Sequence, residues 1–210
     1  MEEGPSSVGG PSCFCGIIAE VPFLLLTHGA GSNRNAPLLV ALANTFAEQG
    51  VEAIRYDLPY RQARAKGPPR PGDAARDREG LREQILKIRE KGPGHVWLGG
   101  HSYGGRQSSM LVAESPGLVD GLLLMSYPLH PPGKPEQLRT AHFPKLNTPV
   151  MFVHGSRDPF GSLDEMRKAV KLIPARVELM EVEGAGHDLG RDQAGLAAKV
   201  AGAFLELQRA

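Results

Sequence analysis

Short apolar runs alternate with longer helix-period segments along the chain from about residue 20 onward. The apolar runs are mostly continuous, without interleaved polar residues, which is typical of strands covered on both faces of a sheet. They lie at Pro22–Thr27, Val51–Tyr56, Val96–Gly99, Leu122–Met125, Val150–His154 and Val177–Val182. Because buried strands alternate with helical segments, the pattern predicts an α/β fold with a mostly parallel central sheet and helices on both faces.

Helical spacing of apolar residues marks the segments between these strands. It occurs within Asp73–Lys91, at Leu81, Ile85 and Ile88, and near the C-terminus, at Leu196, Val200, Phe204 and Leu207. The motif Ser162-Leu163-Asp164-Glu165 predicts a capping box that opens a helix ending near Leu172. Residues Arg106–Ala113 are also expected to be helical.

The length and composition of the chain suit one domain. With 210 residues, of which 41% are hydrophobic and 22% charged, the chain can bury a sizeable core. We expect residues 1–12, which are rich in Gly, Ser and Pro, to be disordered, and residues 13–210 to form a single domain. Cys13–Ala19 is the candidate for an early antiparallel strand.

Charge and cysteine content argue against several function classes. A net charge of +1 offers no general attraction to nucleic acid or to a membrane surface. The basic residues around position 65 are mixed with prolines and indicate a solvated loop more than a phosphate site: Arg61, Arg64, Lys66 and Arg70. Cys13 and Cys15 are too few for a disulfide framework or a structural zinc site. With no apolar run near ~20 residues and no signal peptide, the sequence predicts a cytoplasmic protein.

The stretch Gly99–Arg106, G-G-H-S-Y-G-G-R, can be compared with two known sequence motifs. Gly100-His101-Ser102-Tyr103-Gly104 fits the G-x-S-x-G elbow that presents a nucleophilic serine between a strand and a helix. The same stretch is a near miss of the phosphate-binding G-x-x-x-x-G-K-[ST] loop, because Arg106 and Gln107 stand where that loop has a lysine and a hydroxyl. We favour the elbow, because the chain also offers its partners in the right order.

Those partners follow the last two apolar runs. Asp158 comes just after Val150–His154, and His187 comes just after Val177–Val182. Serine, acid and histidine in this chain order are the triad arrangement of a serine hydrolase with an elbow, in which the acid orients the imidazole and the imidazole takes the serine proton. The sequence therefore predicts Ser102, Asp158 and His187 as catalytic residues. Asp57 is the other plausible acid, but it precedes the serine.

Acyl transfer also needs donors for the oxyanion that develops on the substrate. One is the backbone N–H of Tyr103, directly after the nucleophile. The second is expected from the glycine-rich loop His28-Gly29-Ala30-Gly31, with Ala30 as the predicted donor. Because the residues from Pro128 to Thr148 are too few for a large helical lid, the site is expected to be open.

These motifs resemble those of α/β-hydrolases: H-G-A-G-S as the oxyanion loop, G-H-S-Y-G-G-R as the elbow, and V-H-G-S-R-D-P-F-G and E-G-A-G-H as the acid and histidine loops. The stretch Ser126–Pro144 is similar to a small hydrolase-like group related to dienelactone hydrolases, whose members include a testis-expressed protein and a subunit of a chromatin acetyltransferase complex. Two departures stand out. Ser102 replaces the cysteine of dienelactone hydrolases, and His101 stands where this group often has lysine.

The sequence thus predicts a small serine hydrolase of carboxylesterase or thioesterase type that acts through an acyl-enzyme, without metal or organic cofactor. Its partner would be a small-molecule ester or thioester, with no nucleic acid or membrane; a protein partner is not indicated. Tyr60, Arg106 and Phe160 are the candidate substrate-binding residues by position. The alternative is a non-catalytic scaffold with the same fold, and a nucleotide-binding protein ranks third.

Overall fold

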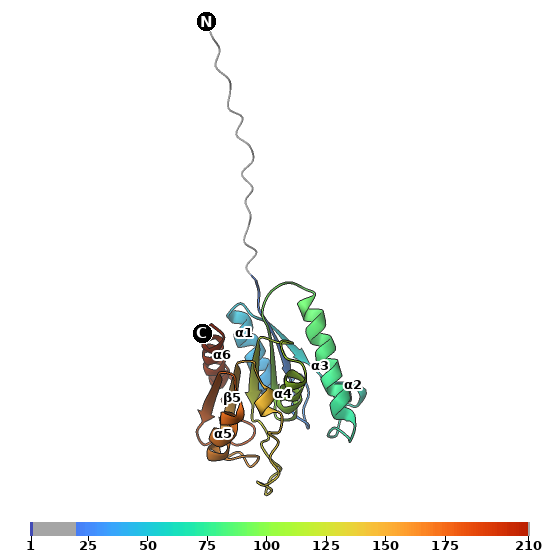
Figure 1. Cartoon of the computed structure of the whole chain (residues 1–210), viewed down its shortest axis with the longest axis vertical. Helices are drawn as coiled ribbons and strands as arrows, with labels where there is room; N and C mark the ends of the chain where they lie inside the picture. The colour runs from blue at the N-terminus through green and yellow to red at the C-terminus, as the bar shows by residue number, and fades with distance from the viewer. Residues whose placement is uncertain (2–19, 210) are drawn as a thin grey trace.

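The computed structural model of the chain describes residue 1 and residues 20–209. Most of the segment 1–12, both cysteines and the candidate strand Cys13–Ala19 therefore lie outside the described residues. The rest of the chain folds around one sheet, with the six predicted strands as its members (Figure 1).

The sheet is parallel throughout and has the strand order β2-β1-β3-β4-β5-β6. Its strands are β1 (Phe23–Thr27), β2 (Glu52–Tyr56), β3 (Val96–His101), β4 (Gly121–Met125), β5 (Val150–Gly155) and β6 (Val177–Val182). The four inner strands are almost wholly buried, whereas the edge strands β2 and β6 are partly exposed and carry charged residues. Charges on the edges discourage pairing with another chain.

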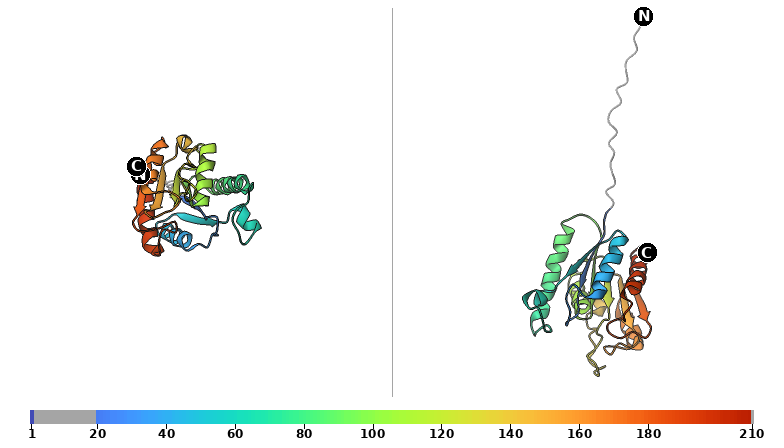
Figure 2. Two further views of the ribbon diagram at one scale, coloured as in Figure 1. Left: turned by 90° about the horizontal axis from the view of Figure 1, so that it is seen from below. Right: turned by 180° about the vertical axis from the view of Figure 1, so that it is seen from behind.

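Helices cover both faces of the sheet, as the sequence predicts (Figures 1 and 2). They are α1 (Pro37–Glu48), α2 (Pro59–Ala63), α3 (Asp73–Arg89), α4 (Tyr103–Glu114), α5 (Leu163–Ala169) and α6 (Gln193–Arg209). Successive side chains of a strand point to opposite faces. Phe23 and Leu25 of β1 accordingly join the core beneath α3 and α4, and Leu24 and Leu26 join the core beneath α1 and α6.

Two helices were not identified from apolar spacing. Helix α1 begins with Pro37 at its first position, where the missing N–H costs nothing, and it buries Leu38, Leu39, Leu42 and Phe46. Helix α2 is a single short turn after β2 that also begins with a proline. Helix α1 begins after the carboxyl end of β1, and α2 follows the carboxyl end of β2; the loop with Ala30 also follows β1.

The predicted capping box is confirmed at the start of α5. The Glu165 backbone N–H donates to Ser162 Oγ at 3.3 Å, and the Ser162 backbone N–H donates to Glu165 Oε2 at 2.8 Å. The helix then tightens into a 3₁₀ turn, Val170–Leu172, so that helical structure ends at the predicted residue.

The connection between β4 and β5 carries no lid in this structure. Its only regular element is a 3₁₀ turn, Phe143–Lys145, and the remainder extends beyond the carboxyl ends of the strands (Figure 1). Within the described residues, no helix combines the length and the apolar character needed to cross a membrane.

We expect Ser162→Ala to lower the free energy of unfolding by about 1 kcal/mol, because the Glu165 backbone N–H loses its acceptor, Ser162 Oγ, while the Ser162 backbone N–H can still donate to Glu165. For a domain of this size that corresponds to a fall in the melting temperature of about 2–4 °C. Ser115→Ala is the control, because the Ser115 hydroxyl makes no hydrogen bond to the described residues. Thermal denaturation followed by circular dichroism measures both variants, and equal melting temperatures would contradict a stabilising box.

Candidate active site

The serine of the elbow has an unusual backbone conformation. Ser102 lies between β3 and α4 with φ 50° and ψ −115°, a region that non-glycine residues rarely adopt. Glycines make the tight turn possible. A Cβ on Gly100 would lie 2.4 Å from the Gly105 nitrogen, and one on Gly104 would lie 2.6 Å from the His28 carbonyl oxygen. The turn therefore has no room for larger side chains at these positions, as the elbow motif predicts.

Ser102, His187 and Asp158 form a continuous hydrogen-bonded chain. His187 Nδ1 lies 2.8 Å from Asp158 Oδ2, and His187 Nε2 lies 2.8 Å from Ser102 Oγ. A carboxylate only accepts, so Nδ1 carries the proton in the neutral ring and Nε2 is free to accept from the serine hydroxyl. The structure thus brings together the three side chains that the sequence analysis selected.

Backbone contacts between two loops hold the acid beside the histidine. The loop after β5 donates to the loop after β6 from the Arg157 N–H, which lies 2.9 Å from the Ala185 carbonyl oxygen. A Cβ on Gly155 would lie 2.4 Å from that same oxygen. Glycine at the end of β5 is therefore what lets the two loops approach, and with them Asp158 and His187.

The Asp158 carboxylate is fully buried, so its charge needs partners. Besides the His187 ring, its Oδ1 accepts from the Phe160 backbone N–H at 2.9 Å. The buried His154 ring is held by the Gly161 carbonyl at 2.8 Å and approaches Asp158 Oδ2 at 4.0 Å. Because Asp158 is surrounded in this way, its carboxylate is oriented toward His187 and away from solvent.

The carbonyl groups of the loop after β1 accept hydrogen bonds that hold the loop in place. Tyr60 Oη donates to the Gly29 carbonyl at 3.2 Å and to the Ala30 carbonyl at 2.8 Å, and Arg61 also donates to the Ala30 carbonyl. The His28 ring adds a bond from Nδ1 to the Gly29 carbonyl at 2.9 Å, with Nε2 accepting from the Leu58 N–H. A trans peptide points its C=O and N–H in opposite directions. The Ala30 N–H, which shares a peptide with the Gly29 carbonyl, therefore points away from Tyr60.

A buried carboxylate links this loop support to the elbow. Asp77 of α3 accepts from the Tyr60 backbone N–H at 2.9 Å and from Tyr103 Oη at 2.7 Å, and the Tyr60 and Tyr103 rings meet edge to face. Burial raises the pKa of Asp77 and also that of Tyr103, whose hydroxyl remains a donor. Sequence analysis missed Asp77, because nothing in a helical Asp marks it as a partner of residues from two other elements.

The three candidate substrate-binding residues lie in different surroundings. Tyr60 is fully buried, so in this structure it supports the Gly29–Gly31 loop and does not line an opening. Phe160 is partly exposed and its ring centroid lies 4.3 Å from that of His187. Arg106 lies near Tyr127 and Arg139, with a buried Nε that has no partner among the described residues.

Three other residues that the sequence analysis discussed have defined surroundings in the structure. Gln107, which would stand at the hydroxyl position of a phosphate loop, is buried and accepts from Arg78 at 3.0 Å. Asp57 binds the Arg34 backbone N–H at 2.6 Å and lies near His28, not His187. Arg61 differs from the expected solvated loop, because it is buried and donates to backbone carbonyls. No group of metal-ligating side chains occurs among residues 20–209.

Several solved structures share this fold. An α/β serine hydrolase homologue from Coxiella burnetii matches with a TM-score of 0.70 and 18% identity, over 87% of this chain and 84% of that chain. Est1E from Butyrivibrio proteoclasticus with ferulic acid bound has a TM-score of 0.73 and 16% identity, over 91% of both chains. A dienelactone hydrolase from Anabaena variabilis has a TM-score of 0.70 and 17% identity, over 90% of this chain and 88% of that chain. At these identities the likeness establishes the fold.

The family assignment comes from the sequence. Residues 20–200 match the family model described as an alpha/beta hydrolase domain. This range contains the elbow, the acid loop and the histidine loop, and it confirms the resemblance inferred from the motifs. The chain therefore belongs to the α/β-hydrolase domain family, and that membership supports a hydrolase activity.

Proposed function

We propose that the protein is a serine hydrolase that cleaves a small ester or thioester through an acyl-enzyme on Ser102. The observation that carries the proposal is the pair of 2.8 Å contacts from Ser102 Oγ to His187 and from His187 to Asp158. A serine hydroxyl is a weak nucleophile until a base takes its proton. In this arrangement His187 Nε2 is that base, and the buried Asp158 stabilises the imidazolium that forms.

The reaction would run in two steps. Ser102 Oγ bonds to the substrate carbonyl carbon while its proton passes to His187, and the collapse of the tetrahedral intermediate releases the alcohol or thiol with that proton. A water then loses a proton to His187 and attacks the acyl carbon. When the bond from that carbon to Ser102 Oγ breaks, His187 returns the proton to Ser102 Oγ and the acid is released. The Tyr103 and Ala30 N–H groups are the proposed donors to the oxyanion, because neither donates to another group in the described part of the chain and Ala30 points away from Tyr60.

The first prediction of this proposal concerns covalent labelling. A fluorophosphonate probe is expected to label the intact protein, with no label on Ser102→Ala and a labelling rate below about a thousandth of the intact rate for His187→Ala. Ser126→Ala is the matched control: Ser126 is another strand-end serine with positive φ, but its buried hydroxyl has no described partner. Label that disappears with Ser126 and persists without Ser102 would overturn the assignment, as would no label on folded protein.

The second prediction concerns the support of the oxyanion loop. We expect Tyr60→Phe to lower kcat for p-nitrophenyl acetate by about tenfold with KM nearly unchanged, because a donor that is less well held stabilises the transition state less. Tyr127→Phe is the control, because Tyr127 is another buried tyrosine that donates to a backbone carbonyl, that of Arg139 at 2.7 Å. Equal loss of kcat in both variants would indicate a general effect on the fold, and unchanged kcat in Tyr60→Phe would exclude a positioning role.

A further inference from the structure

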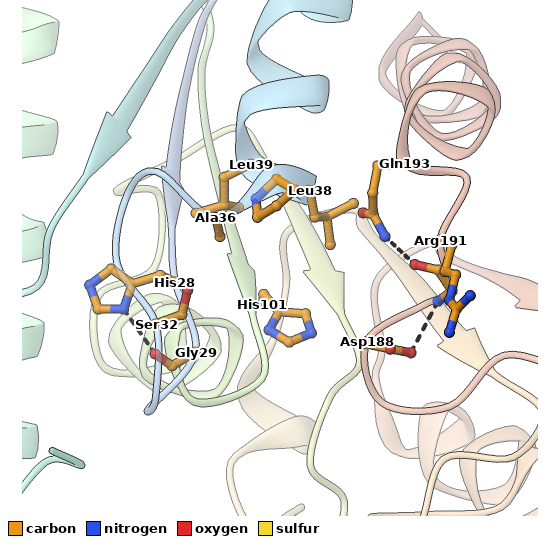
Figure 3. Close-up of a pocket in the computed structure, with 12 residues that line it drawn as sticks. His28, Gly29, Ser32, Ala36, Leu38, Leu39, His101, Asp188, Arg191 and Gln193 are labelled. Atoms are coloured by element: carbon orange, nitrogen blue, oxygen red, sulfur yellow. Dashed lines mark hydrogen bonds between the residues drawn. The ribbon is translucent and has the colours of Figure 1, made fainter. Parts of the chain in front are cut away.

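A cavity of about 400 Å³ lies on the α1 and α6 side of the elbow. Ala36, Pro37, Leu38 and Leu39, from the start of α1 and the residue before it, form its apolar wall. In Figure 3 the loop with His28 and Gly29 lies opposite the segment with Asp188, Arg191 and Gln193, and His101 lies between them. The lining contains none of the three residues of the proposed triad.

The cavity adjoins the proposed catalytic residues through the chain itself. His101 directly precedes Ser102, Asp188 directly follows His187, and Gly29 directly precedes Ala30. A Cβ on Gly29 would lie 3.5 Å from Ser102 Cβ and 3.0 Å from His101 Nδ1, so the Gly29 backbone, which lines the cavity, packs against the serine. A group bonded to Ser102 therefore lies within a few atoms of the cavity.

The polar groups of the cavity favour an uncharged occupant. His101 Nε2 lies 2.9 Å from the His187 carbonyl oxygen, which only accepts, so this nitrogen carries a proton. Burial lowers the pKa of His101, which keeps the ring neutral. At the exposed rim, Asp188 and Arg191 contribute one charge of each sign. Neither an anion nor a cation gains a net attraction from these groups.

The volume sets the size of the occupant. At about 30 Å³ for each water-sized group, the cavity has room for on the order of ten non-hydrogen atoms. Methylene groups buried against its apolar wall would each strengthen the binding free energy in proportion to the apolar area that is buried. An aliphatic chain of medium length meets both conditions.

We propose that this cavity binds an uncharged, medium-length aliphatic chain of the substrate during hydrolysis at Ser102. The inference rests on the proposed serine hydrolase function and narrows its substrate class to aliphatic esters or thioesters. The chain belongs either to the acyl part or to the alcohol part of the substrate, and both have the same chemistry.

The test places a larger side chain on the wall of the cavity, so that the chain of the substrate no longer fits. Ala36 precedes Pro37 and has an extended backbone, which suits leucine as well as alanine, and it makes no side-chain cap to α1. Ala36→Leu thus adds three carbon atoms to the wall with little effect expected on the helix. Ser32→Leu, which fills the cavity from the opposite loop, is the second variant in case the first does not fold. Ala198→Leu on the exposed face of α6 is the matched control.

The assay compares two series of esters on the full chain. In p-nitrophenyl esters from acetate to octanoate, kcat/KM of the intact protein is expected to rise at least about tenfold with chain length, and a chain of equal length ending in a carboxylate is expected to lose that gain. Ala36→Leu abolishes the rise, whereas Ala198→Leu keeps the rise and leaves acetate hydrolysis within about twofold of that of the intact protein. The same pattern in alkyl acetates from methyl to octyl, in place of the acyl series, assigns the cavity to the alcohol part.

Two results would overturn the inference, and they are distinguishable. If the intact protein and the cavity variants are all labelled by the fluorophosphonate but chain length has the same effect on each, the serine is reactive and the cavity does not bind the chain. If the intact protein is not labelled at all, the serine hydrolase proposal fails, and this inference fails with it.

Discussion

The strained backbone of Ser102 is the constraint on which the candidate site depends. A non-glycine residue in such a region costs about 1–3 kcal/mol and persists only where its surroundings hold it. Here the Ser102 N–H donates to the Met125 carbonyl at 2.8 Å, and the Ser102 carbonyl accepts from the Arg106 N–H at 3.0 Å. These bonds anchor the turn to β4 on one side and to α4 on the other, so the hydroxyl is raised above the sheet at a defined place.

The other parts of the site reach that place because backbones approach each other without side chains between them. Gly104 lets the elbow pack against the end of β1, and Gly155 lets the acid loop pack against the histidine loop. Each contact joins loops that follow different strands of the parallel sheet. The carboxyl ends of such strands meet at one edge, where α/β proteins place their reactive groups. Because the loops approach each other closely at this shared edge, the side chains of Ser102 and Asp158 both come within hydrogen-bonding distance of the His187 ring.

Behind this first set of contacts lies a buried polar network that connects the two proposed oxyanion donors. Asp77 binds both Tyr60 and Tyr103, and Tyr60 in turn holds the Ala30 loop. A buried carboxylate is costly unless its hydrogen bonds are satisfied, and here both oxygens have partners. The network lies on the α3 side of the elbow, whereas the apolar cavity lies on the α1 side. The proposed support of the oxyanion donors and the proposed binding of the substrate chain therefore lie on opposite sides of the elbow.

The sequence by itself determined the strands, the fold class, the elbow and the order of Ser102, Asp158 and His187, because these depend on local periodicity and on which residues directly follow a strand. It also predicted the capping box at Ser162, which needs only four consecutive residues. Tertiary structure alone decided that Tyr60 is buried behind the loop, that Asp77 joins two elements, and that a cavity borders His101. Each of these depends on the packing of segments that are distant in the chain, and no local pattern records which face of a short helix such as α2 will be covered.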